Sequence, residues 1–214
     1  MLQRFRFDSA IGTQLRTLGA DAAIAALAEG QHGVVSRTQL LGIGVGKRAI
    51  THRLERRRLH ALYRGVYAVG HSTLGREGRF LAAVVACGPG AVLSYRSAGI
   101  AWDIRRPSVG PIEVTAPRDA RRPGLHVHRA LIPPDERTQR DGVPITTVPR
   151  TLLDLAAVLA VAQVERAVER AEALRLRDTL SLPDLLDRYP RKRGAKTLRW
   201  ILASQARARD DHAQ

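Results

Sequence analysis

The sequence predicts an α+β protein, mostly helical, that begins with a winged helix-turn-helix and continues into a mixed α/β domain. The first reason is that three short amphipathic segments precede two β-prone runs that turn at Arg64-Gly65. The second is that alternating strand patterns then interleave with longer helical patterns. Hydrophobic residues make up 44% of the 214 residues, which is enough apolar surface to bury a core.

Two helices are expected to open the N-terminal domain. Asp21 is placed to cap the first of them, and Ile24 and Leu27 share its apolar face. Ser36 is placed to cap the second, whose Leu40 faces inward. The glycines that follow, at alternate positions from residue 42 to 46, end this short helix.

A third helix is expected over residues 47–57. Its buried seam consists of Ile50 and Leu54, which lie four residues apart and therefore share a face. The run over residues 59–70 then predicts two short strands. Three helices followed by a hairpin is the order of a winged helix-turn-helix.

The second half of the chain mixes strand and helix patterns. Strands are expected over residues 111–115, 125–129 and 143–146, and helices over 79–87, 94–102, 149–159, 161–176, 182–189 and 195–207. These patterns divide the chain into a flexible arm over 1–19, the winged helix-turn-helix over 20–72, an α+β domain over 73–207 and a frayed tail over 208–214.

Charge and cysteine usage indicate which partners and which cellular compartment to expect. The 35 basic residues outnumber the 20 acidic ones, giving a net charge of +15, and nearly all of the basic residues are arginines, which suit phosphate. Cys87 is the single cysteine, so no internal disulfide is possible, as expected in a reducing cytoplasm. The start of the chain lacks the apolar run of a signal peptide, and the longest apolar run, 81–87, is too short to cross a bilayer. We therefore expect a cytoplasmic protein without a membrane partner.

The positive charge concentrates on the third helix and the hairpin, where residues 46–64 hold seven basic residues and a single acid. Because Ile50 and Leu54 are buried, helical spacing turns five side chains outward. We call them the reading face: Lys47, Arg48, Thr51, His52 and Glu55. The third helix of a winged helix enters the major groove, where arginine pairs with guanine, a threonine methyl contacts thymine and glutamate accepts from cytosine. The sequence therefore predicts binding to double-stranded DNA.

Further residues are expected to hold phosphates, which fix register without reading sequence. Arg56, Arg58 and Arg64 lie beyond the reading face on the helix end and the hairpin. Ser36, Arg37 and Thr38 open the second helix, where free backbone N–H groups favour a phosphate. A second basic cluster, residues 188–199, either extends this footprint, binds an acidic partner protein or is an exposed helix end.

Motifs of catalysis are absent from the sequence. A P-loop fails at Leu41 and Arg48, a GxGxxG motif fails at Lys47, and no serine lies in GxSxG. A restriction-type nuclease usually carries a carboxylate two residues before a lysine, and none of the three lysines has one there. We therefore expect no enzyme activity, no catalytic residue and no cofactor.

The best candidates for metal ligands are His126 and His128, which share a face of a strand because they lie two residues apart. No cysteine or third ligand lies near them in sequence, so we expect a surface pair and no metal. Asp154 follows Arg150 by four residues within an apolar run, which indicates a structural salt bridge or cap rather than catalysis.

Several segments together resemble the AbiEi-type antitoxins of type IV toxin–antitoxin systems, especially their actinobacterial relatives. The segments are QHGVVSRTQLLGIGVGKRAITHRL (31–54), RLHALYRGVYAVG (58–70), LAAVVACGPGAVLSYRSAGIAW (81–102), IEVTAP (112–117), LHVHR (125–129) and TTVPRTLLDLA (146–156). The resemblance implies an N-terminal winged helix that binds its own promoter, often as an inverted repeat, and an antitoxin-like domain that counters a nucleotidyltransferase-like toxin. Many relatives continue into a nuclease-like domain, and this sequence stops near Gln214, where that domain would begin.

The resulting hypothesis is a DNA-binding transcriptional regulator of antitoxin type that represses its own operon. One alternative is an accessory module that targets a separate nuclease to DNA. Another is an RNA-binding module, which the small number of aromatic side chains disfavours because single-stranded bases stack on aromatics.

Overall fold

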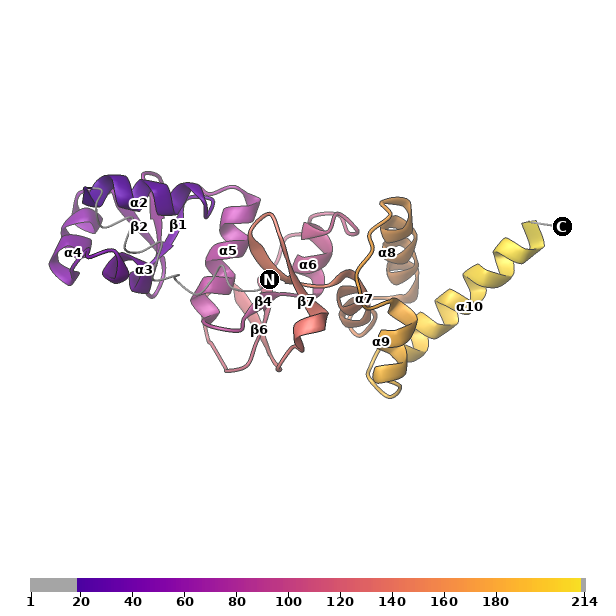
Figure 1. The fold of residues 1–214 in the computed structure, drawn as a ribbon. Coiled ribbons are helices and arrows are strands. Elements are labelled where there is room, and N and C mark those ends of the chain that lie inside the picture. Colours follow the sequence, from indigo (N-terminus) through magenta and orange to yellow (C-terminus); the bar gives the residue numbers. More distant parts are fainter. Residues whose placement is uncertain (1–18, 213–214) are drawn as a thin grey trace.

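The molecule is elongated, with its N-terminal elements at one end and its last helix projecting from the other (Figure 1). The structure, a computed structural model, describes residues 19–212, and the fold is a mixture of helices with two β-sheets. The arm predicted over 1–19 lies outside the described residues except for Gly19. No helix in the described part of the chain is long and apolar enough to cross a membrane.

The N-terminal unit combines three helices with a three-stranded antiparallel sheet. Its elements are α2 (Ala20–Glu29), β1 (Val34–Ser36), α3 (Arg37–Gly42), α4 (Lys47–Glu55), β2 (Leu59–Tyr63) and β3 (Val66–Val69). The strand order is β1-β3-β2, so the predicted hairpin is confirmed, and it turns at Arg64-Gly65 with Gly65 at φ +77°. Strand β1 was not predicted, because three residues are too few to show an alternation.

The core of this unit contains the seam predicted for the third helix. Ile50 is almost fully buried beside Leu40 and Leu59, and Leu54 is half-buried against the same cluster. The prediction that Asp21 caps the first helix is wrong. Gly19 occupies the N-cap position, and Asp21 lies in the first turn, where its carboxylate bonds Arg53 instead.

The second sheet has five strands in the order β6-β5-β4-β8-β7. They are β4 (Val92–Leu93), β5 (Ile112–Ala116), β6 (Leu125–Arg129), β7 (Arg137–Arg140) and β8 (Val143–Thr146). Strand β5 pairs parallel with β6 and antiparallel with β4, while β4 pairs parallel with β8. The three predicted strands are confirmed within one residue, whereas β4 is too short and β7 too polar to show a pattern.

Helix α5 (Arg76–Cys87) lies between the two sheets (Figure 1) and forms one core with both. That core joins Leu81 of the helix to Val34 and Val66 of the first sheet and to apolar side chains of the second. Helix α6 (Tyr95–Ala101) lies near the opposite, polar face of the second sheet. The Ser97 hydroxyl accepts a hydrogen bond from the Glu113 amide of strand β5, and the Ser94 hydroxyl accepts one from the Thr115 hydroxyl.

The remaining helices form a third cluster at the far end. They are α7 (Val148–Ala156), α8 (Val161–Ala173), α9 (Leu182–Arg188) and α10 (Ala195–His212). Leu153, Val164, Leu185 and Leu198 are fully buried where these helices meet. Helix α10 continues to His212, beyond the end at residue 207 that the sequence predicted for this helix. Residues 213–214 lie outside the described part.

A buried ionic network joins the second sheet to these helices. The guanidinium of Arg150, on α7, donates to both carboxylate oxygens of Asp154 at 3.0 and 3.1 Å and to Glu136 at 2.7 Å. Glu136 ends the short 3-10 helix η1 (Pro134–Glu136) and also accepts from Arg188 and Tyr189. Arg150, Glu136 and Asp154 are at most 4% exposed. The predicted salt bridge between Arg150 and Asp154 is confirmed.

Replacing Arg150 by Met tests this network. The change keeps a long apolar stem but leaves Glu136 and Asp154 as buried carboxylates without their main partner, which typically costs about 3–5 kcal/mol. We expect a loss of this size in the free energy of unfolding, measured by denaturant titration. Arg166→Met on the exposed face of α8 is the matched control and should change stability by less than about 0.5 kcal/mol. Equal effects of the two changes would show that the buried network contributes nothing specific.

Candidate functional site

The five side chains of the predicted reading face are all exposed on α4. Ile50 and Leu54 occupy the opposite side of the helix and pack into the N-terminal core. Helix α4 lies at the outer end of the molecule, away from the second sheet and the C-terminal helices (Figure 1). A long partner can therefore approach it without meeting the rest of the described chain.

The start of α4 has an unusual charge distribution. Lys47 and Arg48 occupy its first turn, which contains no acidic residue, and Gly46 at the N-cap contributes no side-chain hydrogen bond. The partial positive charge at a helix N-terminus disfavours nearby cations by about 0.3–1 kcal/mol each. An anion bound at this end would remove the penalty, so the local electrostatics favour a negatively charged partner.

Asp21 bonds two basic side chains near the reading face, Arg53 within α4 and Arg58 after it. Its carboxylate lies 2.8 Å from the Arg53 guanidinium and 3.1 Å from that of Arg58. Hydrogen bonding and charge from Arg53, with a smaller contribution from the charge of Arg58, lower the pKa of Asp21. The side chain of Arg53 is only 14% exposed, whereas that of Arg58 is 66% exposed and keeps part of its guanidinium open to solvent. Arg58 therefore remains available to a phosphate, and Arg53 does not.

The expectation of free backbone N–H groups at the start of α3 fails for three of the amides there, those of Ser36, Arg37 and Gln39. Ser36 and Gln39 form a capping box, in which the Ser36 amide donates to the Gln39 side chain and the Gln39 amide donates to the Ser36 hydroxyl. The Arg37 amide donates to the carbonyl of Gly65 in the hairpin turn. These three donors are used within the protein, so the side chain of Arg37 and the side chain and amide of Thr38 stay as candidates for a phosphate contact.

The bond between Arg37 and Gly65 also positions the hairpin. It fixes the β2–β3 turn against the start of α3 at an N···O distance of 2.8 Å. Arg64, at the tip of this turn, is exposed, as is Arg56 at the end of α4. The three arginines predicted to contact phosphates are thus all exposed, at the C-cap of α4, on the segment after it and on the turn: Arg56, Arg58 and Arg64.

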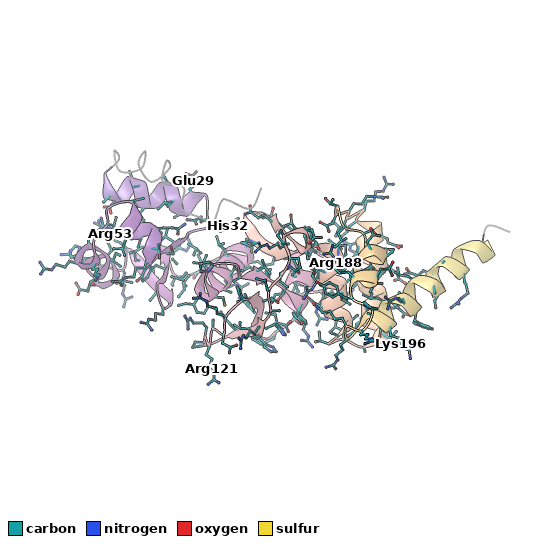
Figure 2. All side chains as sticks on the ribbon, turned by 60° about the horizontal axis from the view of Figure 1, so that its bottom comes forward. Glu29, His32, Arg53, Arg121, Arg188 and Lys196 are labelled. Carbon is teal, nitrogen blue, oxygen red and sulfur yellow. The ribbon has the colours of Figure 1, made fainter. Side chains whose placement is uncertain are left out.

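The second basic cluster, residues 188–199, does not adjoin this surface. Figure 2 shows Arg53 at one end of the molecule and Arg188 and Lys196 among the C-terminal helices. Arg188 bonds Asp135 and Glu136, and Lys192 lies 3.7 Å from Asp154. Much of the charge in this cluster therefore stabilises the fold, which contradicts a single footprint extending from α4.

A second group of candidate site residues lies on the polar face of the second sheet. The expectation that His126 and His128 have no third ligand nearby is wrong, because Glu113 of strand β5 joins them. Their ligand atoms all lie within 4.8 Å of one another. Strands β5 and β6 pair in parallel with Glu113 opposite His126, which places all three side chains on one face.

Sequence reasoning missed Glu113 because it lies on a different strand from the histidines. A signal was present nonetheless: IEVTA and LHVHR alternate in the same phase, with polar side chains at the second and fourth positions of each. Parallel pairing in register makes these polar positions neighbours. The direction and register of the pairing could not be read from either strand alone.

Comparisons with known proteins add little to this geometry. No family model matches the chain, and no curated protein matches its sequence. Among solved structures, the RV2827C protein from Mycobacterium tuberculosis is similar at 17% sequence identity and a TM-score of 0.38, over 70% of this chain and 71% of that chain. A similarity this weak supports no inference about function.

The capping box at α3 is testable by Ser36→Ala. Loss of an N-cap side chain costs about 0.5–2 kcal/mol, since an amide loses its acceptor. We expect the free energy of unfolding to fall by about 1 kcal/mol in denaturant titrations. Ser72→Ala, at an exposed position after the hairpin, is the control and should leave stability unchanged. If Ser36→Ala is as neutral as the control, the capping box does not stabilise α3.

Proposed function

We propose that this protein binds double-stranded DNA site-specifically and regulates transcription, with residues 20–72 forming a winged helix-turn-helix. The main support is the exposed reading face on α4, the third helix of the N-terminal unit. The element order of helix, strand, two helices and a two-stranded hairpin supports this assignment, in which α4 is the recognition helix and the β2–β3 turn is the wing.

The dimensions and chemistry of α4 suit the major groove. A helix with its side chains is about 10–12 Å across, and the major groove is about 12 Å wide. Arg48 at the first turn is placed to donate two hydrogen bonds to guanine, and Thr51, one turn later, to contact a thymine methyl. Glu55, a further turn along, accepts from cytosine in the same scheme.

Sequence-independent affinity comes in this proposal from the arginines around the reading face. Arg56, Arg58 and Arg64 contact phosphates on either side of the groove, and Lys47 contributes charge at the helix start. Phosphates near this helix end also offset the unfavourable placement of Lys47 and Arg48 in the field of the helix dipole.

The resemblance to AbiEi-type antitoxins adds a regulatory target and a protein partner to the proposal. On that basis, the protein represses its own operon, at an operator that is an inverted repeat, and residues 73–207 counter a nucleotidyltransferase-like toxin. Identification of the adjacent gene would test the toxin partner directly.

Sequence reading by α4 is tested by the double change Arg48→Ala with Thr51→Ala. A preferred duplex is first selected from a random pool, and its affinity is then compared with that of a scrambled duplex by fluorescence anisotropy. Loss of a bidentate base contact costs about 1–3 kcal/mol, so we expect the preference to fall by about 5- to 150-fold. Preserved preference in the variant would contradict the assignment of α4 as recognition helix.

Phosphate binding is tested by Arg56→Ala with Arg64→Ala. This variant should weaken binding to the preferred and scrambled duplexes alike, and reduce the slope of log affinity against log salt by about 2, since each phosphate contact contributes about 0.9. Arg166→Ala, exposed on α8 at the other end of the molecule, is the control and should leave affinity and slope unchanged.

Tighter binding of single-stranded RNA than of duplex DNA by the unmodified protein would favour the RNA-binding alternative.

A further inference from the structure

The two faces of the second sheet differ sharply in chemistry. Ile112, Val114 and Val127 point into the apolar core shared with α5. The alternate positions on strands β5 and β6 hold Glu113, Thr115, His126 and His128, on the face toward α6. Buried polar side chains are costly unless they are satisfied, so a polar face this rich in titratable groups calls for a specific explanation.

One ring nitrogen in this cluster has no partner. Nε2 of His128 is buried and makes no hydrogen bond to any atom of residues 19–207. The nearest Glu113 oxygen, Oε2, is 3.7 Å away, which is too long for a hydrogen bond. Two ligand atoms bound to one tetrahedral Zn²⁺, at about 2.0–2.2 Å each, lie about 3.4 Å apart. The gap between Nε2 and Oε2 is thus close to the separation that an ion between them requires.

The neighbouring side chains hold these ligand atoms in place. The Tyr95 ring stacks on His128 with ring centroids 3.7 Å apart, and His126 stacks on the same ring at 4.3 Å. The Arg96 guanidinium donates to Oε1 of Glu113 at 2.7 Å, so Oε2 is the oxygen that faces His128. Oε2 accepts one bond from the Arg96 amide at 3.1 Å and keeps a second lone pair. The contacts of Tyr95 and Arg96 thus orient the ligand atoms of His128 and Glu113 before an ion arrives.

We propose that Glu113, His126 and His128 form a binding site for a divalent transition-metal ion of the Zn²⁺ class. Two imidazoles and one carboxylate are ligands that Zn²⁺ accepts, whereas Mg²⁺ and Ca²⁺ prefer oxygen alone. His126 is exposed, so its ring can turn the short distance needed to complete the set. Glu113 and His126 also line a cavity of about 370 Å³, which provides an entry path and room for a water molecule as fourth ligand.

Such an ion would tie strand β6 to its neighbour. Strand β6 is an edge strand of the sheet and is preceded by the exposed, arginine-rich loop over residues 117–124. The three ligands come from two adjacent strands, so a bound ion links them through side chains in addition to the backbone ladder. Because the ion binds the folded form, it raises the midpoint of thermal unfolding.

The test is calorimetric titration of Zn²⁺ into the full chain after treatment with a chelator. We expect one saturable site per chain, weakened at least about tenfold by His126→Ala and by His128→Ala, as ligand loss typically demands. His71→Ala, an exposed histidine after the hairpin, is the control and should leave affinity unchanged. No saturable binding, or binding that both ligand variants retain in full, would overturn the proposal.

A second readout guards against loss of folding. His128 packs on Tyr95, so its replacement can disturb the fold, whereas the exposed His126 can be changed with little effect on packing. Co²⁺ is added in place of Zn²⁺ and its visible absorption is recorded, because low-symmetry coordination by nitrogen and oxygen intensifies it. We expect this absorption in the unmodified chain and in His71→Ala, and its loss in His126→Ala while the thermal midpoint without metal stays the same. Intense absorption in a folded His126→Ala variant would contradict the assigned ligand set.

Discussion

Helix α5 is packed on two sides, and this constraint determines how the rest of the molecule is arranged. Its Leu81 shares one apolar core with Val34 of the first sheet and Val114 of the second. At Gly78 the helix comes so close to the loop before β1 that an added Cβ would lie 2.7 Å from the His32 carbonyl oxygen. The N-terminal unit therefore packs directly against the element that covers the second sheet, and its helix α4 lies at the outer end of the molecule (Figure 1).

The second sheet separates two kinds of chemistry by the alternation of its strands. Residues on one face supply the apolar contacts that α5 requires, and residues on the other form the polar cluster around Glu113. Burial alone raises the pKa of Glu113, but its interactions with His128 and Arg96 outweigh that effect and lower the pKa to about 2. The alternation therefore keeps the apolar contacts with α5 and the polar cluster on separate faces, so the fold and a ligand site do not use the same side chains.

Local rules predicted the fold where the chain obeys them and failed where distant residues decide. The seam of Ile50 and Leu54 and the turn at Gly65 are local, because helical spacing and a positive φ determine them. The prediction of the reading face followed from that seam, because helical spacing places the remaining side chains on the exposed side of the helix. Asp21 fits the rule for a helix cap, yet its partner Arg53 lies 32 positions away and no local pattern reveals it. Likewise, Glu113 meets His128 only through the parallel register of two strands.

The central claim, that α4 contacts duplex DNA, is tested most directly by amide hydrogen exchange on the free protein and on its complex with the selected duplex. Exchange reports on backbone N–H groups one segment at a time. The account predicts slower exchange in the complex over residues 46–58 and 63–66, and unchanged exchange over α8 and α10. Protection confined to the C-terminal helices, or absent from α4 in a saturated complex, would contradict it.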